Sequence, residues 1–164
     1  MADDSVGAND GALSGAASFT ALGQVGGAID FAGGQVTMPA SVLLAVDPGD
    51  KVSASMWIRP ASFAASYNTV FDSAGRHLAI WIESPAVGWA GAGGGNAGLA
   101  YSPGWTLDEW QHLAVTYDGA IPSRPYLVYR NGTQVASWLS GGGQTFTAPW
   151  IIAGNPSGGG SPFA

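Results

Sequence analysis

The stretch WQHLAVTYDG, residues 110–119, decides the fold class of this chain. Its apolar residues Leu113, Val115 and Tyr117 fall at every second position, and successive side chains of a β-strand alternate between two faces. Period-two segments bounded by Gly, Pro, Asn or Ser recur along the chain, whereas no window keeps apolar residues at helical spacing for three turns. The sequence therefore predicts an all-β protein, with at least one face of this strand in the core.

A tight hairpin is indicated a few residues further on. Asn131-Gly132 lies between the alternating segments YLVYR and TQVASWL. A two-residue type I′ turn needs a positive φ at both central positions, which Asn and Gly tolerate. We therefore predict two antiparallel strands joined by this dipeptide.

Similar strand patterns occur along the rest of the chain. They cover Gln24–Phe31, Gln35–Met38, Val52–Arg59, Asn68–Asp72, His77–Glu83, Gly98–Tyr101, Trp110–Tyr117, Tyr126–Arg130, Thr133–Leu139 and Trp150–Ala153. So many short strands predict two packed antiparallel sheets, the arrangement of a jelly-roll sandwich. The length of 164 residues suits one hydrophobic core, so we expect residues 1–164 to form a single domain.

The composition excludes several kinds of partner and chemistry. The chain has 5 Lys and Arg against 11 Asp and Glu, which gives a formal net charge of −6. A negative surface repels phosphate backbones, so we expect no nucleic acid partner. No apolar run approaches the roughly 18 residues that cross a bilayer, so we expect no membrane insertion. The absence of cysteine excludes disulfides and thiolate metal sites.

Several segments, taken in order, resemble the laminin-G-like jelly-roll domains of the concanavalin A-like lectin and glucanase superfamily. They are DDSVGANDGALSG, VGGAIDFAGG, VTMP, VSASMWIRP, LDEWQHLAVTYDG, YRNG and WIIAG. The resemblance covers nearly the whole chain. It implies a two-sheet antiparallel sandwich and an extracellular or cell-surface location, although this chain carries no signal peptide pattern.

Two departures from the family pattern limit what the resemblance implies. Ala32 stands where the family often has Asp, and the family normally continues with a further strand beyond the position of Phe163. We therefore expect a C-terminally truncated domain. The alternative is that another chain completes the sandwich, including self-association through an unpaired sheet edge.

Signals of catalysis are weak. Residues 93–98 match G-x-G-x-x-G, but a dinucleotide site needs a strand before this motif and a helix after it. Glu83 and Glu109 are the two glutamates, and neither is placed to form the carboxylate pair of a glycosidase. We expect no enzyme, and keep an unrecognised glycosidase as a third alternative because the fold hosts such enzymes.

Calcium binding is a separate question, because this ion takes several carboxylate and carbonyl oxygens. Asp4 and Asn9 or Asp10 lie in the amino-terminal loop that resembles the family's cation-binding segment. Ala32 removes a further expected ligand. A solvated acidic loop is the preferred interpretation, and a Ca²⁺ site the alternative.

Sugar binding would require exposed aromatic rings, which stack against the apolar faces of pyranoses. Trp89, Tyr101 and Trp105 flank glycine-rich and Pro-Gly loops, so we predict that they contact a ligand. The alternative is that each ring covers the core. Trp57 and Trp110 lie in the segments that match the family best, and we predict that both are core residues.

The sequence thus predicts a non-catalytic recognition module, binding carbohydrate, within a larger secreted or surface protein. The alternative is a structural or adhesive domain that engages protein partners. Function inferred from fold is an analogy, and the site must decide between them.

Overall fold

A computed structural model describes residues 1–3, 5, 7–39, 51–62, 68–73, 79–83, 86–90, 96–101, 105–118, 120–121, 126–138 and 150–153. Every regular element among them is a strand. The strands are β1 (Ala12–Ser14), β2 (Ser18–Thr20), β3 (Ala28–Asp30), β4 (Gln35–Thr37), β5 (Lys51–Ile58), β6 (Asn68–Ser73), β7 (Ala79–Glu83), β8 (Ala86–Ala90), β9 (Asn96–Tyr101), β10 (Gln111–Asp118), β11 (Tyr126–Arg130), β12 (Thr133–Trp138) and β13 (Trp150–Ile152).

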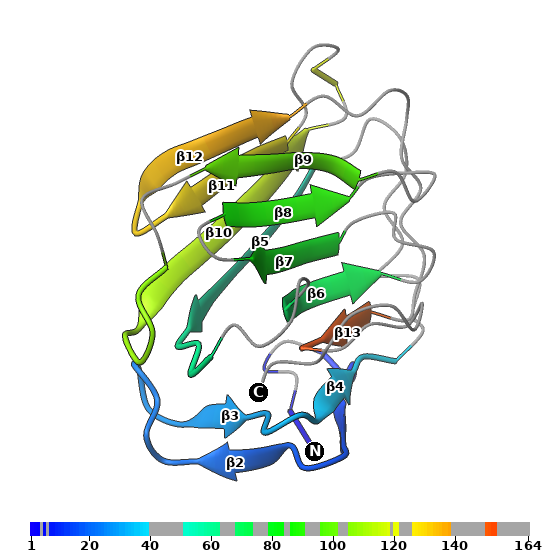
Figure 1. Cartoon of the computed structure of the whole chain (residues 1–164). Helices are drawn as coiled ribbons and strands as arrows, with labels where there is room; N and C mark the ends of the chain where they lie inside the picture. The colour runs from blue at the N-terminus through cyan, green and yellow to red at the C-terminus, as the bar shows by residue number, and fades with distance from the viewer. Residues whose placement is uncertain are drawn as a thin grey trace.

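The strands form two large sheets and a separate hairpin (Figure 1). One sheet has seven strands in the order β1-β4-β13-β6-β7-β8-β9, and the other has four in the order β12-β11-β10-β5. The hairpin pairs β2 with β3. All ladders between the described strands are antiparallel, so the predicted all-β jelly-roll sandwich is confirmed.

The described part of the chain offers no helix that is long and apolar enough to cross a membrane.

The core lies between the two sheets. Along β10 buried and half-buried residues alternate without a break, and Leu113, Val115 and Tyr117 are on the buried side, as the sequence predicts. They pack in one cluster with side chains of the seven-stranded sheet, including Ile80 and Trp150. The period of two in the sequence is therefore the pattern of burial against the opposite sheet.

The predicted hairpin at Asn131-Gly132 is confirmed. Both residues have positive φ, 49° and 78°, and they join β11 to β12. The Asn131 side chain also fixes this turn to β10, because its Oδ1 accepts a hydrogen bond of 2.8 Å from the backbone N–H of His112. Asn131 therefore adopts the backbone conformation of the turn and also bonds the turn to the neighbouring strand β10.

A second pair of left-handed residues turns the chain from β3 into β4. Ala32 has φ 40° and Gly33 has φ 85°. The Gly34 N–H donates to the carbonyl of Phe31, which closes the turn. Alanine is unfavourable at a positive φ, where its Cβ approaches the backbone, whereas Asn and Asp are tolerated.

We expect Ala32→Asn to stabilise the protein by about 0.5–1 kcal/mol, because it places a tolerated residue in the left-handed region. The measurement is the free energy of unfolding in urea. Ala21→Asn, at an exposed position whose φ is not positive, is the control and should change it little. An equal effect of both variants would contradict the explanation by backbone conformation.

The strand predictions need three corrections. The sequence does not predict strands β1, β2 and β8. The strand predicted over Gln24–Phe31 is shorter in the structure, where only residues 28–30 form β3. The glycine-rich segment between Trp89 and Tyr101, which the sequence predicts as a loop, contributes residues 96–98 to the start of β9. Residues 141–143 and 154–164 lie outside the described residues, and the expected C-terminal truncation stays a prediction.

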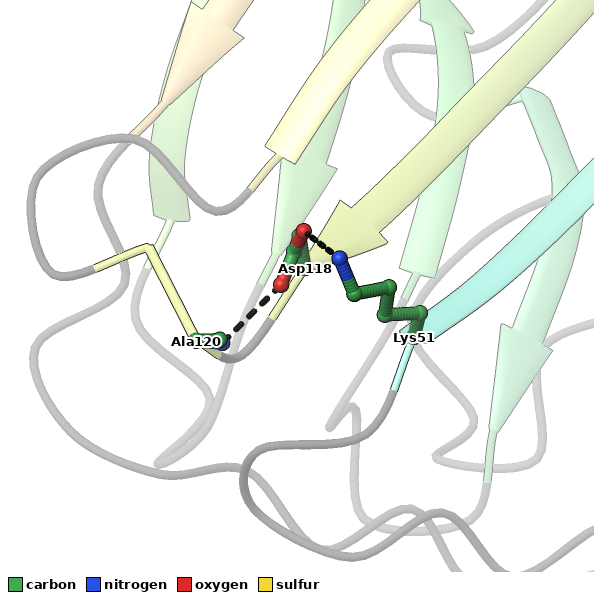
Figure 2. Close-up of polar contacts among 3 residues, drawn as sticks. All are labelled: Lys51, Asp118 and Ala120. Atoms are coloured by element: carbon green, nitrogen blue, oxygen red, sulfur yellow. Dashed lines mark hydrogen bonds and ion pairs between the residues drawn. The ribbon is translucent and has the colours of Figure 1, made fainter.

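An ion pair joins β5 and β10 at the end opposite Trp57. Lys51 Nζ lies 2.6 Å from Asp118 Oδ2, and Asp118 Oδ1 accepts a 3.0 Å hydrogen bond from the Ala120 N–H (Figure 2). The hydrogen bond from Lys51 is the main cause that lowers the pKa of Asp118, against a smaller opposing effect of desolvation. The ion pair joins the end of β10 to β5, and the hydrogen bond holds the chain that follows β10.

The lowered pKa of Asp118 gives a pH dependence of known sign. A carboxyl whose pKa is lower in the folded protein contributes stability above its unfolded pKa of about 3.9, and this contribution is lost as pH falls through the folded pKa. We therefore expect acid to lower the melting temperature of the natural chain more than that of Asp118→Asn. Melting curves between about pH 6 and pH 2.5 test this expectation. Parallel losses in the two proteins would contradict it.

Candidate functional site

A cleft of about 510 Å³ opens between the β2–β3 hairpin and the end of β5. Its floor consists of buried core residues, among them Ile58, Val70 and Ala153. The hairpin forms one wall. The described residues that line the cleft are Thr20, Leu22, Gln24, Val25, Gly27, Ala28, Ile29, Asp30, Phe31, Ala32, Trp57, Ile58, Arg59, Ala61, Val70, Trp110, Ile152 and Ala153.

Trp57 lies at the open side of this cleft. Its side chain is 44% exposed, whereas the next residue, Ile58, is buried. Adjacent strand residues point to opposite faces, so Trp57 projects from the outer face of the four-stranded sheet. The prediction that Trp57 is a core residue is therefore wrong. Its ring packs against His112, its partner across the ladder, with centroids 5.2 Å apart and planes at 58°.

Trp110 lines the same side of the cleft and is half-buried, so it is not the full core residue that was predicted. The guanidinium carbon of Arg59 lies 5.8 Å from the centroid of the Trp110 ring, a cation–π distance. The next residue, Gln111, is buried, and its Nε2 donates a 2.9 Å hydrogen bond to the Thr106 carbonyl. This bond fixes the backbone that carries Trp110.

The cleft combines apolar surface with a few polar groups. Trp57 and Trp110 supply aromatic surface, and Gln24, Asp30 and Arg59 supply hydrogen-bond donors and acceptors. Its volume lies in the range of about 300–1,000 Å³ that is typical of small-ligand sites. The arrangement can hold an uncharged amphipathic molecule, with stacking on one side and hydrogen bonds on the other.

Of the predicted ligand-contacting residues, Trp105 is not among the described residues that line this cleft. Trp105 is only 5% exposed and packs in the core cluster, with the Arg130 guanidinium carbon 5.6 Å from its ring centroid. A buried ring has no free face for a sugar, so the alternative of a ring covering the core describes Trp105 better. Trp89 and Tyr101 lie in adjacent strands, with their backbones opposite Gly98 and Ala86, and their contact with a ligand stays a prediction.

The structure brings no calcium ligand set together in its described part. Asp4 lies outside the described residues, and Asn9 and Asp10 are half-buried beside the short bridge between Ala2 and Gly11. No group of three or more His, Asp or Glu side chains that could hold a metal ion occurs among the described residues. The Ca²⁺ site stays a prediction.

The two antiparallel sheets and their strand order are those of a concanavalin A-like sandwich. Residues 30–164 match the family model Laminin_G_3, of the concanavalin A-like lectin/glucanases superfamily. The chain belongs to this family, and the resemblance seen in the sequence is confirmed. No curated protein sequence matches the chain.

Solved structures share the fold at low sequence identity. Domain 4 of AbnA, an extracellular GH43 arabinanase from Geobacillus stearothermophilus, was solved with arabinotriose. It is 16% identical with a TM-score of 0.68, and the match covers 94% of this chain and 78% of that one. A botulinum neurotoxin type C structure, in a study of entry through two ganglioside molecules, is 14% identical with a TM-score of 0.60, over 95% of this chain and 39% of that one.

A third structure is the binding domain of botulinum neurotoxin DC in complex with rat synaptotagmin II. It is 13% identical with a TM-score of 0.62, over 88% of this chain and 38% of that one. This chain thus spans well under half of the two toxin chains. At these identities the likeness shows the fold alone.

Proposed function

We propose that this chain is a carbohydrate-binding module and that an oligosaccharide binds at the mouth of the cleft, with a sugar ring on Trp57. The observation that carries the proposal is the 44% exposure of this tryptophan beside a cleft of about 510 Å³. Burying an aromatic side chain stabilises a fold by about 1.5–3 kcal/mol, so a half-open tryptophan keeps apolar surface available for a ligand.

The polar groups at the mouth favour a neutral sugar. Arg59 is the cation and Asp30 the anion among the described residues that line the cleft, so their charges balance. The chain as a whole carries a formal charge of −6, which disfavours an acidic polysaccharide. Gln24 and Thr20 add uncharged hydrogen-bonding groups of the kind that orient sugar hydroxyls.

The cleft supports binding better than hydrolysis. Glycosidases of most families use two carboxyl groups on either side of the scissile bond. Asp30 is the single carboxylate among the described residues of the cleft, and Glu109 is exposed and not among them. We therefore infer that the module holds a glycan and that any chemistry belongs to other domains.

The comparisons support this proposal at the level of the fold. An arabinanase domain of this fold was solved with arabinotriose, and that enzyme is described as extracellular. We accordingly place this chain, as a single domain over residues 1–164, in a larger secreted or surface protein. The argument from these relatives is an analogy, and the test must address the site itself.

The test is calorimetric titration of the chain with arabinotriose, a set of other neutral oligosaccharides, and uronic acid oligosaccharides of matched length. We expect one or more neutral ligands to bind with a Kd of about 1 mM or tighter, and the acidic ligands to bind at least tenfold more weakly. Binding should change the tryptophan fluorescence, because Trp57 would be covered. Absence of binding to every neutral oligosaccharide, or equal binding of the acidic ones, would contradict the proposal.

A further inference from the structure

Two charged side chains line the cleft from its two walls. Asp30 is the last residue of β3, on the hairpin wall, and Arg59 directly follows β5, on the wall of the four-stranded sheet. Neither residue forms an ion pair with another described residue. Both are exposed, so both can act on a ligand in the cleft.

The guanidinium of Arg59 is held by an aromatic ring. Its carbon lies 5.8 Å from the centroid of Trp110, a cation–π distance. Arg59 and Trp110 lie one position beyond the paired residues Ile58 and Gln111, so the contact continues the ladder between β5 and β10. An interaction with the ring uses no N–H group of the guanidinium. Arg59 therefore presents oriented hydrogen-bond donors at the mouth of the cleft.

Arg59 lies on the same face of the sheet as Trp57. Ile58 between them is buried, whereas both of its neighbours are exposed. Residues two apart in an extended strand are separated by about 7 Å along the chain. A sugar ring on Trp57 would therefore direct its edge, which carries the hydroxyl groups, toward Arg59. The planar fork of the guanidinium suits two adjacent hydroxyl oxygens, because it has several donors and no acceptor.

Arg59 alone would favour an acidic sugar. A carboxylate is a strong partner of a guanidinium, since two parallel charge-assisted hydrogen bonds form between them. Asp30 opposes this choice, because its carboxylate repels a second carboxylate in the same cleft of about 510 Å³. A hydroxyl group, in contrast, can accept a hydrogen bond from Arg59 or donate one to Asp30.

We propose that Asp30 determines the specificity of this site by excluding the acidic sugars that Arg59, held by Trp110, would otherwise bind. Together the two charged residues select a neutral sugar with two adjacent unsubstituted hydroxyl groups. The inference rests on the proposed carbohydrate function and adds which residues decide the class of sugar. Specificity in binding sites commonly comes from a group that repels the wrong ligand as well as from contacts with the right one.

The first test is a change of specificity. Asp30→Asn keeps the size of the side chain and removes its charge, and calorimetric titration compares a neutral oligosaccharide with a uronic acid oligosaccharide of the same length. We expect the acidic ligand to bind about fivefold more tightly than to the natural chain, and the preference for the neutral ligand to fall about tenfold. Asp3→Asn is the control, because it removes the same charge at an exposed position outside the described cleft lining. It should leave both affinities unchanged.

Two variants of Arg59 test its part in the proposal. Arg59→Lys keeps the charge but loses the planar fork, and Arg59→Gln loses both. We expect each to weaken binding of the neutral oligosaccharide about tenfold, because neither side chain can make the paired contact with adjacent hydroxyl oxygens. Added to Asp30→Asn, Arg59→Gln should abolish the gain in binding of the acidic ligand. Melting curves of all variants show that each is folded.

The outcomes separate this inference from the proposed function. If the natural chain binds neutral oligosaccharides but Asp30→Asn has the same specificity as Asp3→Asn, Asp30 does not select the sugar, and the carbohydrate function stands. Unchanged affinity in Arg59→Gln would likewise overturn only the inference. If the natural chain binds no neutral oligosaccharide, the proposed function and the inference both fail.

Discussion

Replacing Trp57 by alanine is expected to weaken oligosaccharide binding about thirtyfold. Central aromatic residues in binding sites contribute about 2 kcal/mol or more when truncated, and each 1.4 kcal/mol corresponds to a tenfold change in Kd. The loss should appear mainly in affinity, because a side chain that is 44% exposed contributes less to folding than a buried one. Calorimetric titration with the best ligand of the neutral set measures the effect.

Phe19→Ala is the matched control for this variant. Phe19 is an aromatic residue on the hairpin, 59% exposed, and it is not among the residues that line the cleft. Its removal should change the Kd less than twofold. If Trp57→Ala binds as tightly as the natural chain, or if the control loses as much affinity, the sugar does not lie on Trp57.

Gly34→Ala is expected to destabilise the fold by about 3 kcal/mol, because the added methyl group has no free space. A Cβ at this position would lie 2.5 Å from the Ser14 carbonyl oxygen and against the backbone N of Ala17, closer than real Cβ contacts occur. These neighbours are backbone atoms at the end of β1 and in the β1–β2 connection, so no rotamer change can relieve the clash. Natural domains are stable by about 5–15 kcal/mol, so a large part of the stability would be lost. Urea unfolding measures the effect.

A glycine can be needed for its left-handed backbone or because a Cβ has no space, and Gly33→Ala tests the first of these reasons alone. Gly33 has a φ of 85°, but the space that a Cβ would occupy there is open, so its substitution should cost only the backbone conformation, about 1–2 kcal/mol. Gly34 has no positive φ, so glycine is needed at this position only because a Cβ would have no space. If Gly33→Ala were the more damaging variant, close packing would not be the reason for Gly34.

Much of the fold could be predicted because local pattern and tertiary burial agree. The alternation in β10 and the Asn131-Gly132 turn are local signals, and both correspond to the structure. Strands β1 and β2 have three residues each, too few for a period of two to show. Strand β8 reads AVGWA, where a glycine among small residues weakens the β signal.

The site was harder to predict, although one signal was available. Ser53 and Ser55 share the parity of Trp57 in β5, so the polar residues already indicated that this face points to solvent. The family resemblance favours the opposite interpretation, because Trp57 lies in one of the segments that match the family best. The burial of Trp105 had no such signal, because it precedes β10 in an irregular segment whose position depends on contacts far along the chain.

The position of β13 has a consequence for how the polypeptide assembles. Its residue Ile151 pairs with Thr37 of β4 on one side and Asp72 of β6 on the other, so more than 100 positions of sequence separate the first pair. Ladders between such distant segments close slowly, because the entropy of a large loop is lost before any contact compensates for it. The meander β10–β11–β12 needs only short loops. We therefore expect the meander to form early during refolding, and the seven-stranded sheet to join at β13 in a late, rate-limiting step.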